Sequence, residues 1–276
     1  ENVSVYKTIL LSSTPINFAL NMDRLYVIRT GLIGIELIKG IYSDTPFIEK
    51  VITLPRHPYY ILMIPAFLKE SDGYCYVSLS GGAMVSVIQG TNTNNPTLLK
   101  TFDVPTARSK LAVTPNGKYC YILSINTLTI IKDANTDNPT ILNTLTLSTI
   151  SNLYEIEITP DGNYIYVLAT FPQPSSLIIL KDASTDNPTL LKTINFTFIP
   201  SKVSFLKNGQ YACVTSNGTG IITIIQNAST DNPVIMYTSS ANTGIEPWGV
   251  ASANNFFCIP YKYSDFINKI YIRRKV

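Results

Sequence analysis

Charged residues are scarce in this chain, at 14% of 276 residues, and the formal net charge is only +3. An ordinary globular domain carries about 25% charged residues. So few charges exclude a disordered chain and a coiled coil, because both depend on a high charge content. The small net charge also gives no electrostatic basis for a nucleic-acid partner, and we expect none.

Histidine is nearly absent too, since His57 is the only one. A Ser-His-Asp triad would have to use it, and a histidine-rich metal site is excluded. The sequence also lacks a Walker-type phosphate loop, a Gly-x-Ser-x-Gly elbow, and the His-Glu-x-x-His and Cys-x-x-Cys motifs. We therefore expect no catalytic residue, no metal ligand, no cofactor and no enzymatic activity.

Long apolar runs are missing as well, because none approaches the 18 residues or more of a membrane span. We accordingly expect no membrane span. No signal-peptide pattern is present, but the printed chain starts at Glu1 rather than Met, so earlier removal of a leader stays open.

What the chain has in abundance is Thr, Ser and Asn, with 17 Tyr and 17 Pro, a mixture that favours short strands and turns. It also repeats itself. Residues 187–193, Asn-Pro-Thr-Leu-Leu-Lys-Thr, recur identically at 95–101. Related starts at positions 45, 95, 138, 187 and 232 give steps of 50, 43, 49 and 45 residues. This period is typical of a four-stranded propeller blade, which takes about 40–50 residues.

Each repeat predicts four strands joined by short turns. In the fourth repeat we expect strands at 155–158, 164–169, 176–181 and 189–196, with a type I or II turn at 160–162. The middle strands are apolar on both sides, which fits a sheet sandwiched between neighbours. A parallel α/β sheet would need helical crossovers of ten or more residues, and these connections are too short.

The last repeat stops after its third strand, and the N-terminus offers the missing one. Residues 2–9 match the fourth-strand pattern of 187–194, one further step of 46 residues away. The sequence therefore predicts an all-β fold: a single domain over 1–276 that forms a six-bladed β-propeller of four-stranded antiparallel blades. N-terminal residues 1–15 would complete the C-terminal blade and remove its open edge. A capped solenoid, the alternative, predicts no such match between the two ends.

Three segments resemble known propeller repeats. Residues 158–167, Ile-Thr-Pro-Asp-Gly-Asn-Tyr-Ile-Tyr-Val, resemble the YVTN-type repeat of surface-layer-like β-propeller proteins, and 247–251, Pro-Trp-Gly-Val-Ala, resemble its first strand. Residues 177–188, Leu-Ile-Ile-Leu-Lys-Asp-Ala-Ser-Thr-Asp-Asn-Pro, resemble the LVIVD repeat of bacterial and archaeal surface proteins. The resemblance implies a surface-exposed structural or binding propeller. A related branch contains lactonases, but no catalytic set of that branch is matched here.

The four cysteines lie in the second strand of four repeats, at Cys75, Cys120, Cys213 and Cys258. Equivalent strands of adjacent blades lie about 10 Å apart, whereas a disulfide needs Cα atoms within about 7 Å. We expect four buried, unpaired thiols. They favour folding in a reducing compartment, whereas the resemblance implies an extracellular, cell-surface or particle-surface location.

Ligands are expected at one end of the propeller, on the variable loops that follow the second and fourth strands. The opposite turns, Pro-Asp-Gly and Asp-Asn-Pro, are more simply structural. Aromatic and arginine residues are common at binding hot spots. The candidate binding residues of the loop face and channel mouth are Tyr60, Arg108, Lys110, Tyr154, Glu155, Lys202 and Trp248.

Three of these candidates occupy one repeat position, at the start of the innermost strand. Lys110, Glu155 and Lys202 would place a carboxylate between two ammonium groups at the channel mouth. Such an arc predicts attraction of a small anion or of an acidic side chain from a partner. Exposed pairs contribute only about 0–1 kcal/mol each, so stability alone is a poor reason for the arc.

Three functions remain open. The first is a non-enzymatic structural or interaction propeller that binds a protein partner or surface assembly through its loop face. The second is a lectin-like propeller that binds a glycan, although its aromatic residues differ between repeats. The third is a lactonase-like hydrolase, for which the few acidic candidates on that face are Glu155, Glu157, Glu246 and Asp265.

Overall fold

The computed structural model describes most of the chain. The described residues are Ile9, 11–64, 73–81, 83–105, 110–147, 151–171, 173–216, 218–239, 246–247, 250–252, 254–262 and 267–271. They fall into two compact units. The first contains residues up to Leu111 and the segment 133–140, and the second contains 112–132 and the residues from 141 onward. The prediction of a single domain stays a prediction.

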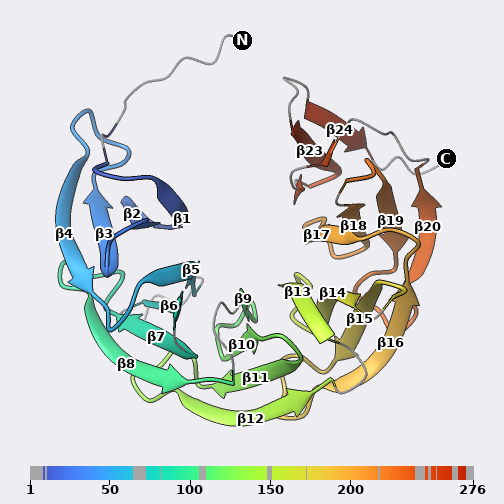
Figure 1. The fold of residues 1–276 in the computed structure, drawn as a ribbon, viewed down its shortest axis with the longest axis horizontal. Coiled ribbons are helices and arrows are strands. Elements are labelled where there is room, and N and C mark those ends of the chain that lie inside the picture. The colour runs from blue at the N-terminus through green and yellow to red at the C-terminus, as the bar shows by residue number, and fades with distance from the viewer. Residues whose placement is uncertain are drawn as a thin grey trace. The chain divides into compact units, whose positions relative to one another are not determined.

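Every regular element in the described residues is a β-strand, and the 24 strands form six sheets (Figure 1). The all-β prediction is confirmed. No helix among these residues is long and apolar enough to cross a membrane. In five of the six sheets, each strand bonds to the next strand of that sheet along the chain.

The first unit holds two complete sheets. Their strands are β1 (Pro15–Asn21), β2 (Arg24–Arg29), β3 (Gly34–Lys39), β4 (Phe47–Thr53), β5 (Pro58–Met63), β6 (Tyr74–Leu79), β7 (Met84–Gln89) and β8 (Thr97–Asp103). Strands β3 and β6 are buried along almost their whole length. The core between the two sheets is built from aliphatic side chains of β2, β3, β6 and β7.

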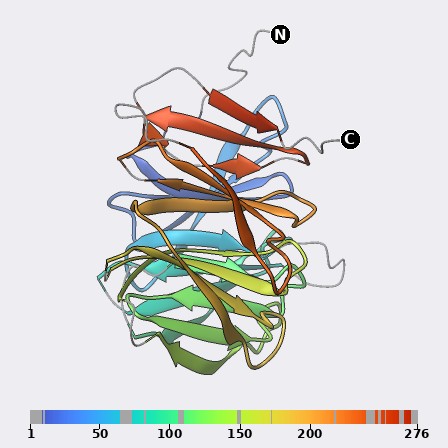
Figure 2. The same ribbon diagram turned by 90° about the vertical axis from the view of Figure 1, so that its right-hand side faces the viewer.

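The other four sheets lie in the second unit, apart from Lys110, Leu111 and Thr140 of the first of them, which belong to the first unit. These strands are β9 (Lys110–Val113), β10 (Tyr119–Leu123), β11 (Thr127–Lys132), β12 (Thr140–Thr146), β13 (Ser151–Ile158), β14 (Tyr164–Phe171), β15 (Ser176–Lys181), β16 (Thr189–Asn195), β17 (Pro200–Phe205), β18 (Tyr211–Ser216), β19 (Ile222–Gln226), β20 (Val234–Thr238), β21 (Glu246–Pro247), β22 (Ala251–Ser252), β23 (Phe256–Lys262) and β24 (Ile267–Tyr271). Strands of one sheet are visibly twisted against each other, as in β17–β20 (orange in Figure 2).

The predicted strands of the fourth repeat match β13–β16 closely, and the turn is resolved as type I. Gly162 N donates to Thr159 O at 2.8 Å, and the positive φ of 75° falls on Gly162 rather than on Asp161. A type II turn would need the positive φ one residue earlier. The Thr159 hydroxyl donates to the Asp161 carboxylate at 2.5 Å and accepts from Tyr164 N at 3.0 Å. Thr114, Asn116 and Gly117 make the same bonds, which explains why the motif recurs as Thr-Pro-Asn-Gly.

The turn between the third and fourth strands also uses one conformation repeatedly. Its first residue has a positive φ, a value that Gly, Asp and Asn tolerate best. The residues at this position are Gly40, Gly90, Asp133, Asp182 and Asn227. Three residues later in all five of these turns, a Ser or Thr hydroxyl accepts a backbone N–H, as Thr185 accepts from Asn187 N at 3.3 Å.

A buried tyrosine links neighbouring sheets in both units, which sequence analysis did not predict. In the first unit, Tyr26 donates to Thr91 O at 3.0 Å and Tyr76 to Ala134 O at 3.1 Å. In the second unit, Tyr121 donates to Ala183 O at 2.6 Å and Tyr166 to Ala228 O at 2.8 Å. We call these four bonds the tyrosine latches. Burial raises the pKa of Tyr26, Tyr121 and Tyr166, so each phenol stays a donor.

A second tyrosine, two residues before the latch, binds an aspartate of the same neighbouring turn. Tyr119 donates to Asp186 at 2.5 Å, and Lys132 donates to the other oxygen of that carboxylate at 2.6 Å. These two bonds hold the pKa of Asp186 below its usual value. Tyr74 reaches Asp137 at 2.7 Å in the same way.

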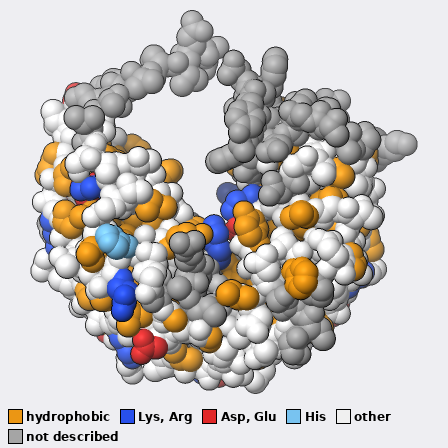
Figure 3. All heavy atoms as spheres, in the orientation of Figure 1, with side chains coloured by type: hydrophobic (Ala, Val, Ile, Leu, Met, Phe, Trp, Pro, Cys, Tyr) orange, Lys and Arg blue, Asp and Glu red, His pale blue; other side chains and the backbone are white. Residues whose placement is uncertain are grey.

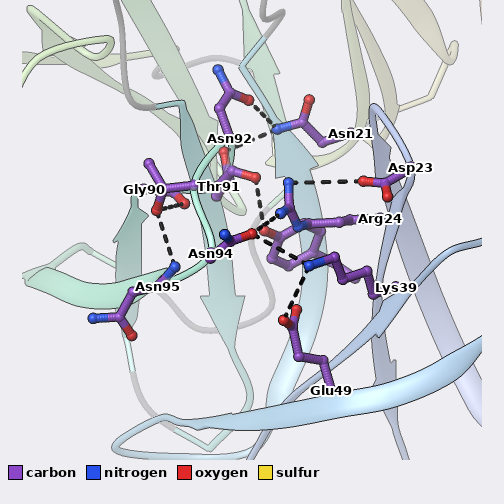
Figure 4. A network of polar contacts seen from close by, with 12 residues as sticks. Asn21, Asp23, Arg24, Lys39, Glu49, Gly90, Thr91, Asn92, Asn94 and Asn95 are labelled. Atoms are coloured by element: carbon purple, nitrogen blue, oxygen red, sulfur yellow. Dashed lines mark hydrogen bonds and ion pairs between the residues drawn. The ribbon is translucent and has the colours of Figure 1, made fainter.

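Between the first two sheets, an arginine and an asparagine occupy the positions that tyrosine and aspartate hold in those two joints (Figure 4). Arg24 donates to the amide oxygen of Asn94 at 2.8 Å, and Lys39 donates to it at 3.3 Å. Arg24 also lies 3.8 Å from Asp23, and Lys39 lies 3.6 Å from Glu49. Here two cations share one neutral acceptor.

The last sheet contains β23, with β21 and β22 along one edge and β24 along the other. The predicted closing strand at residues 2–9 lies outside the described residues except for Ile9, so ring closure stays a prediction. None of the four cysteines forms a disulfide. Cys75, Cys120 and Cys213 are buried as expected, but Cys258 is only partly buried.

Candidate functional site

Sequence analysis proposed seven binding residues, and the structure describes five of them. Arg108 and Trp248 lie outside the described residues. Tyr60 lies in β5, Lys110 begins β9, Tyr154 and Glu155 lie in β13, and Lys202 lies in β17. The first two belong to the first unit and the other three to the second.

Within the first unit, Lys110 lies against Tyr60. The ammonium group is 4.4 Å from the centroid of the phenol ring, a cation–π geometry. Such a contact contributes about 0.5–1 kcal/mol when exposed. The structure therefore brings two of the predicted residues together.

Within the second unit, Glu155 and Lys202 form an ion pair between adjacent sheets. Each is the first residue after a register shift of its strand, between Leu153 and Glu155 in β13 and between Pro200 and Lys202 in β17. A β-bulge redirects the side chains that follow it, which explains why these two face each other. The Glu155 side chain is buried, and an unpaired carboxylate there would be costly.

Glu157 adds a second carboxyl group two residues further along β13. Burial, reinforced by the negative charge of Glu155 and opposed by the ammonium of Lys202, raises the pKa of Glu157 to about 7. Its side chain is nevertheless reached by solvent, because it lines an open cavity, and water screens part of these interactions. Two carboxyl groups, those of Glu155 and Glu157, therefore lie near the ammonium group of Lys202. The wider arc that includes Lys110 stays a prediction.

The cavity lies where three innermost strands end. It has a volume of about 470 Å³ and is lined by Glu157, Ile158, Pro160, Ser204, Phe205, Lys207, Ser252 and Asn254. The sequence placed Glu157 on the loop face, whereas it lines this cavity at the turn end of β13. The other lining residues were not expected, because the adjoining turns were given a structural role only. The repeat alignment was the available signal, since Glu157 and Ser204 occupy the same strand position.

Large apolar side chains are exposed at the other end of these sheets, on the predicted loop face. Ile125, Tyr154 and Phe171 are 54%, 46% and 59% exposed. The backbone places them close together: Leu153 N donates to Ile125 O at 2.9 Å, and Ser151 is the register partner of Phe171. We call these three residues the apolar loop cluster.

Groups of metal-ligating side chains are not found in the part of the chain that the structure describes. No three His, Cys, Asp or Glu residues within it are placed to hold a metal ion. His57 is an exposed loop residue whose Nδ1 lies 3.3 Å from Leu32 O. Charged side chains are sparse among neutral and apolar ones on the face drawn in Figure 3.

Comparison with known proteins identifies the fold. No family model and no curated protein matches the chain. A protein of unknown function from Desulfotomaculum acetoxidans DSM 771 is similar in structure, with a TM-score of 0.75 and 15% identity, over 96% of this chain and 84% of that one. The β-propeller domain of Cps50 (Swd1) from Myceliophteria thermophila gives a TM-score of 0.65 at 12% identity, over 91% and 81%.

A third similar structure is a Bacteroides fragilis protein provisionally named a 6-phosphogluconolactonase. Its TM-score is 0.66 at 15% identity, over 83% of this chain and 71% of that one. Identities this low carry information on fold and not on activity. Together with the repeated four-stranded antiparallel sheets, they show that the chain has a β-propeller fold.

Proposed function

We propose that this protein is a non-enzymatic interaction propeller that binds a protein partner through its loop face. The observation that carries the proposal is the apolar loop cluster, Ile125, Tyr154 and Phe171. Exposed apolar side chains gathered at loop ends of a rigid scaffold are typical of protein interfaces, where aromatic residues supply much of the affinity.

The architecture that we propose is a closed ring of six blades. Residues 3–9 would pair with β24 and form the fourth strand of the last blade. The match between residues 2–9 and 187–194 supports this arrangement. The repeats resemble the YVTN and LVIVD types, and on that basis we propose an extracellular, cell-surface or particle-surface setting with a surface assembly as partner.

A glycan-binding function has weaker support. Lectin-like propellers would present similar pockets in several blades. Here the equivalent loop positions differ, since Tyr154 in β13 corresponds to Ser201 in β17. For a lactonase-like activity, no three His, Cys, Asp or Glu residues in the described part of the chain are placed to hold a metal ion.

The test compares chemical crosslinking of three forms of the full chain in its native source material. The first is the wild type, the second carries Tyr154→Ser with Phe171→Ser, and the third carries Tyr42→Ser as a control. Tyr42 is a highly exposed aromatic residue at a turn of the first unit. We expect one partner to be crosslinked to the wild type and the control, and its yield to fall about tenfold in the double variant.

Equal crosslinking of all three forms would contradict the proposal. So would specific retention on a glycan array, which would favour the lectin-like alternative. Turnover of a sugar lactone that is lost in Glu157→Gln would favour the hydrolase. Melting temperatures of the three forms should agree, because the substituted side chains are exposed.

A further inference from the structure

The cavity in the second unit is formed by equivalent ends of three adjacent sheets. Glu157 and Ile158 end β13, Ser204 and Phe205 end β17, and Ser252 ends β22. The turns that follow contribute Pro160, Lys207 and Asn254. Its volume of about 470 Å³ lies within the range of small-molecule sites, about 300–1,000 Å³.

Two opposite charges face this one cavity without meeting each other. Among the described residues, neither the Glu157 carboxylate nor the Lys207 ammonium forms an ion pair or hydrogen bond. The nearby Glu155 and Lys202 neutralise each other in their own pair. Glu157 and Lys207 are therefore the two charged groups that a bound molecule would meet.

The remaining lining is neutral and divides into two kinds of surface. Ser204, Ser252 and Asn254 offer hydroxyl and amide groups that can donate or accept hydrogen bonds. Ile158 and Phe205 offer a buried apolar wall, and the Phe205 ring is fixed by an edge-on contact with Tyr166 at 4.8 Å. A wall held in place in this way favours a ligand with a small apolar portion.

We propose that this cavity binds a small zwitterion of the amino-acid class, with its ammonium group on Glu157 and its carboxylate on Lys207. A ligand with both charges satisfies both groups, whereas a singly charged ligand leaves one of them unpaired. The serine and asparagine groups would complete the hydrogen bonding of the ligand's charged ends. The site lies at the turn end of the sheets, so it is separate from the apolar loop cluster.

Calorimetry on the full chain tests the proposal, with each common L-amino acid as probe and with methylamine and acetate as singly charged controls. We expect at least one amino acid to bind at least about tenfold more tightly than methylamine or acetate. Absence of binding by every amino acid would overturn the proposal, as would equal binding of methylamine.

Three variants locate the binding. Glu157→Gln keeps the shape and removes the negative charge, and Lys207→Met removes the positive one. Each substitution should lower the affinity for the amino acid by at least about tenfold. Lys118→Met, at the corresponding turn of the sheet β9–β12, is the matched control and should leave the affinity within about twofold. Unchanged affinity in both cavity variants would place the binding elsewhere and overturn the assignment.

Proton release gives an independent readout. The groups that face Glu157 are Glu155 on its own strand and Lys202 and Lys207 from β17 and its turn. A ligand ammonium would lower the raised pKa of Glu157, so binding near pH 7 should release protons and affinity should rise from pH 6 to pH 8. Calorimetry in two buffers of different ionisation enthalpy measures the release. Its persistence in Glu157→Gln would overturn the proposal.

Discussion

The Tyr121 hydroxyl shows how much can depend on one atom. It is buried and donates to Ala183 O at 2.6 Å. In Tyr121→Phe that carbonyl would lose its donor inside the core, which costs about 1–3 kcal/mol. We expect the free energy of unfolding, measured by urea denaturation, to fall by this amount.

Tyr237→Phe is the control for this change, since Tyr237 is an exposed residue of β20. Removing the Tyr237 hydroxyl should change the free energy of unfolding by less than about 0.5 kcal/mol. Equal effects of the two substitutions would show that the latch bond contributes nothing beyond the ring.

The cysteines differ in accessibility, and this predicts an order of reaction. Burial raises the pKa of the Cys120 and Cys213 thiols and also shields them. Cys258 is partly exposed. Because only an accessible thiolate reacts readily, we expect Cys258 to be labelled first in the native protein and the three buried thiols only after unfolding. Mass spectrometry after brief alkylation identifies the site, and labelling of Cys120 first would contradict the prediction.

At the scale of the element, the turns depend on glycine to different degrees. Gly162 has a φ of +75°, and a Cβ there would come within 3.0 Å of Pro115 Cδ and Ser184 Oγ. Gly31 has a φ of +77° with nothing within 4 Å. Gly31→Ala should therefore cost about 1–2 kcal/mol from backbone strain alone. Gly162→Ala should cost about 1 kcal/mol more from overpacking, as thermal or urea unfolding would show. Equal losses would mean that the turn shifts to make room.

The joint between the first two sheets offers the opposite test, a gain of stability. Asn94→Asp would give Arg24 and Lys39 a charged acceptor in place of a neutral one. We expect an increase of about 0.5–1 kcal/mol in the free energy of unfolding at low salt, shrinking as salt is added. Glu49→Gln serves as the reciprocal control and should destabilise, since it removes the 3.6 Å pair with Lys39. A salt-independent effect of Asn94→Asp would exclude the electrostatic cause.

The sequence was sufficient to predict the strands and turns of the repeats, because their causes are local. Thr159, Asp161 and Gly162 bond within a few residues of each other, so any copy of the motif forms the same turn. Glu155 and Lys202 were predicted to lie near each other only because they occupy the same position in adjacent repeats. The β-bulges that aim the two side chains arise from pairing with β14 and β18, which a single strand does not reveal.

The cavity could not be predicted for a related reason. Glu157 and Lys207 are 50 positions apart in the sequence, and only the packing of β13 beside β17 brings them to one opening. The tyrosine latches could not be predicted because their acceptors are main-chain carbonyls, which every residue type has. Apolar strands indicated burial but not which tyrosines would donate.

At the scale of the whole molecule, the main test concerns closure. Among the described residues, β24 pairs only with β23, which leaves one of its edges open. If residues 1–9 cover that edge, their deletion should lower the melting temperature by more than about 10 °C, because an entire strand and its packing are lost. Deleting only residue 1 is the control. A truncated chain that melts with the full-length protein would contradict the closed ring.

The direction of the tyrosine latches has a consequence for how such a chain can grow. In each latch, a tyrosine side chain of one repeat donates a hydrogen bond to a backbone carbonyl of the next. The acceptor residue can differ, since it is Thr91 in one latch and Ala228 in another. A duplicated repeat would thus arrive with a donor for its successor and an acceptor for its predecessor, whatever its loops have become. Gene duplication can add whole repeats without redesigning any joint, while the loops diverge freely. In the next repeat, the position equivalent to Tyr166 is Cys213, which has no phenol to donate. Related proteins should therefore differ first in the residue at this joint.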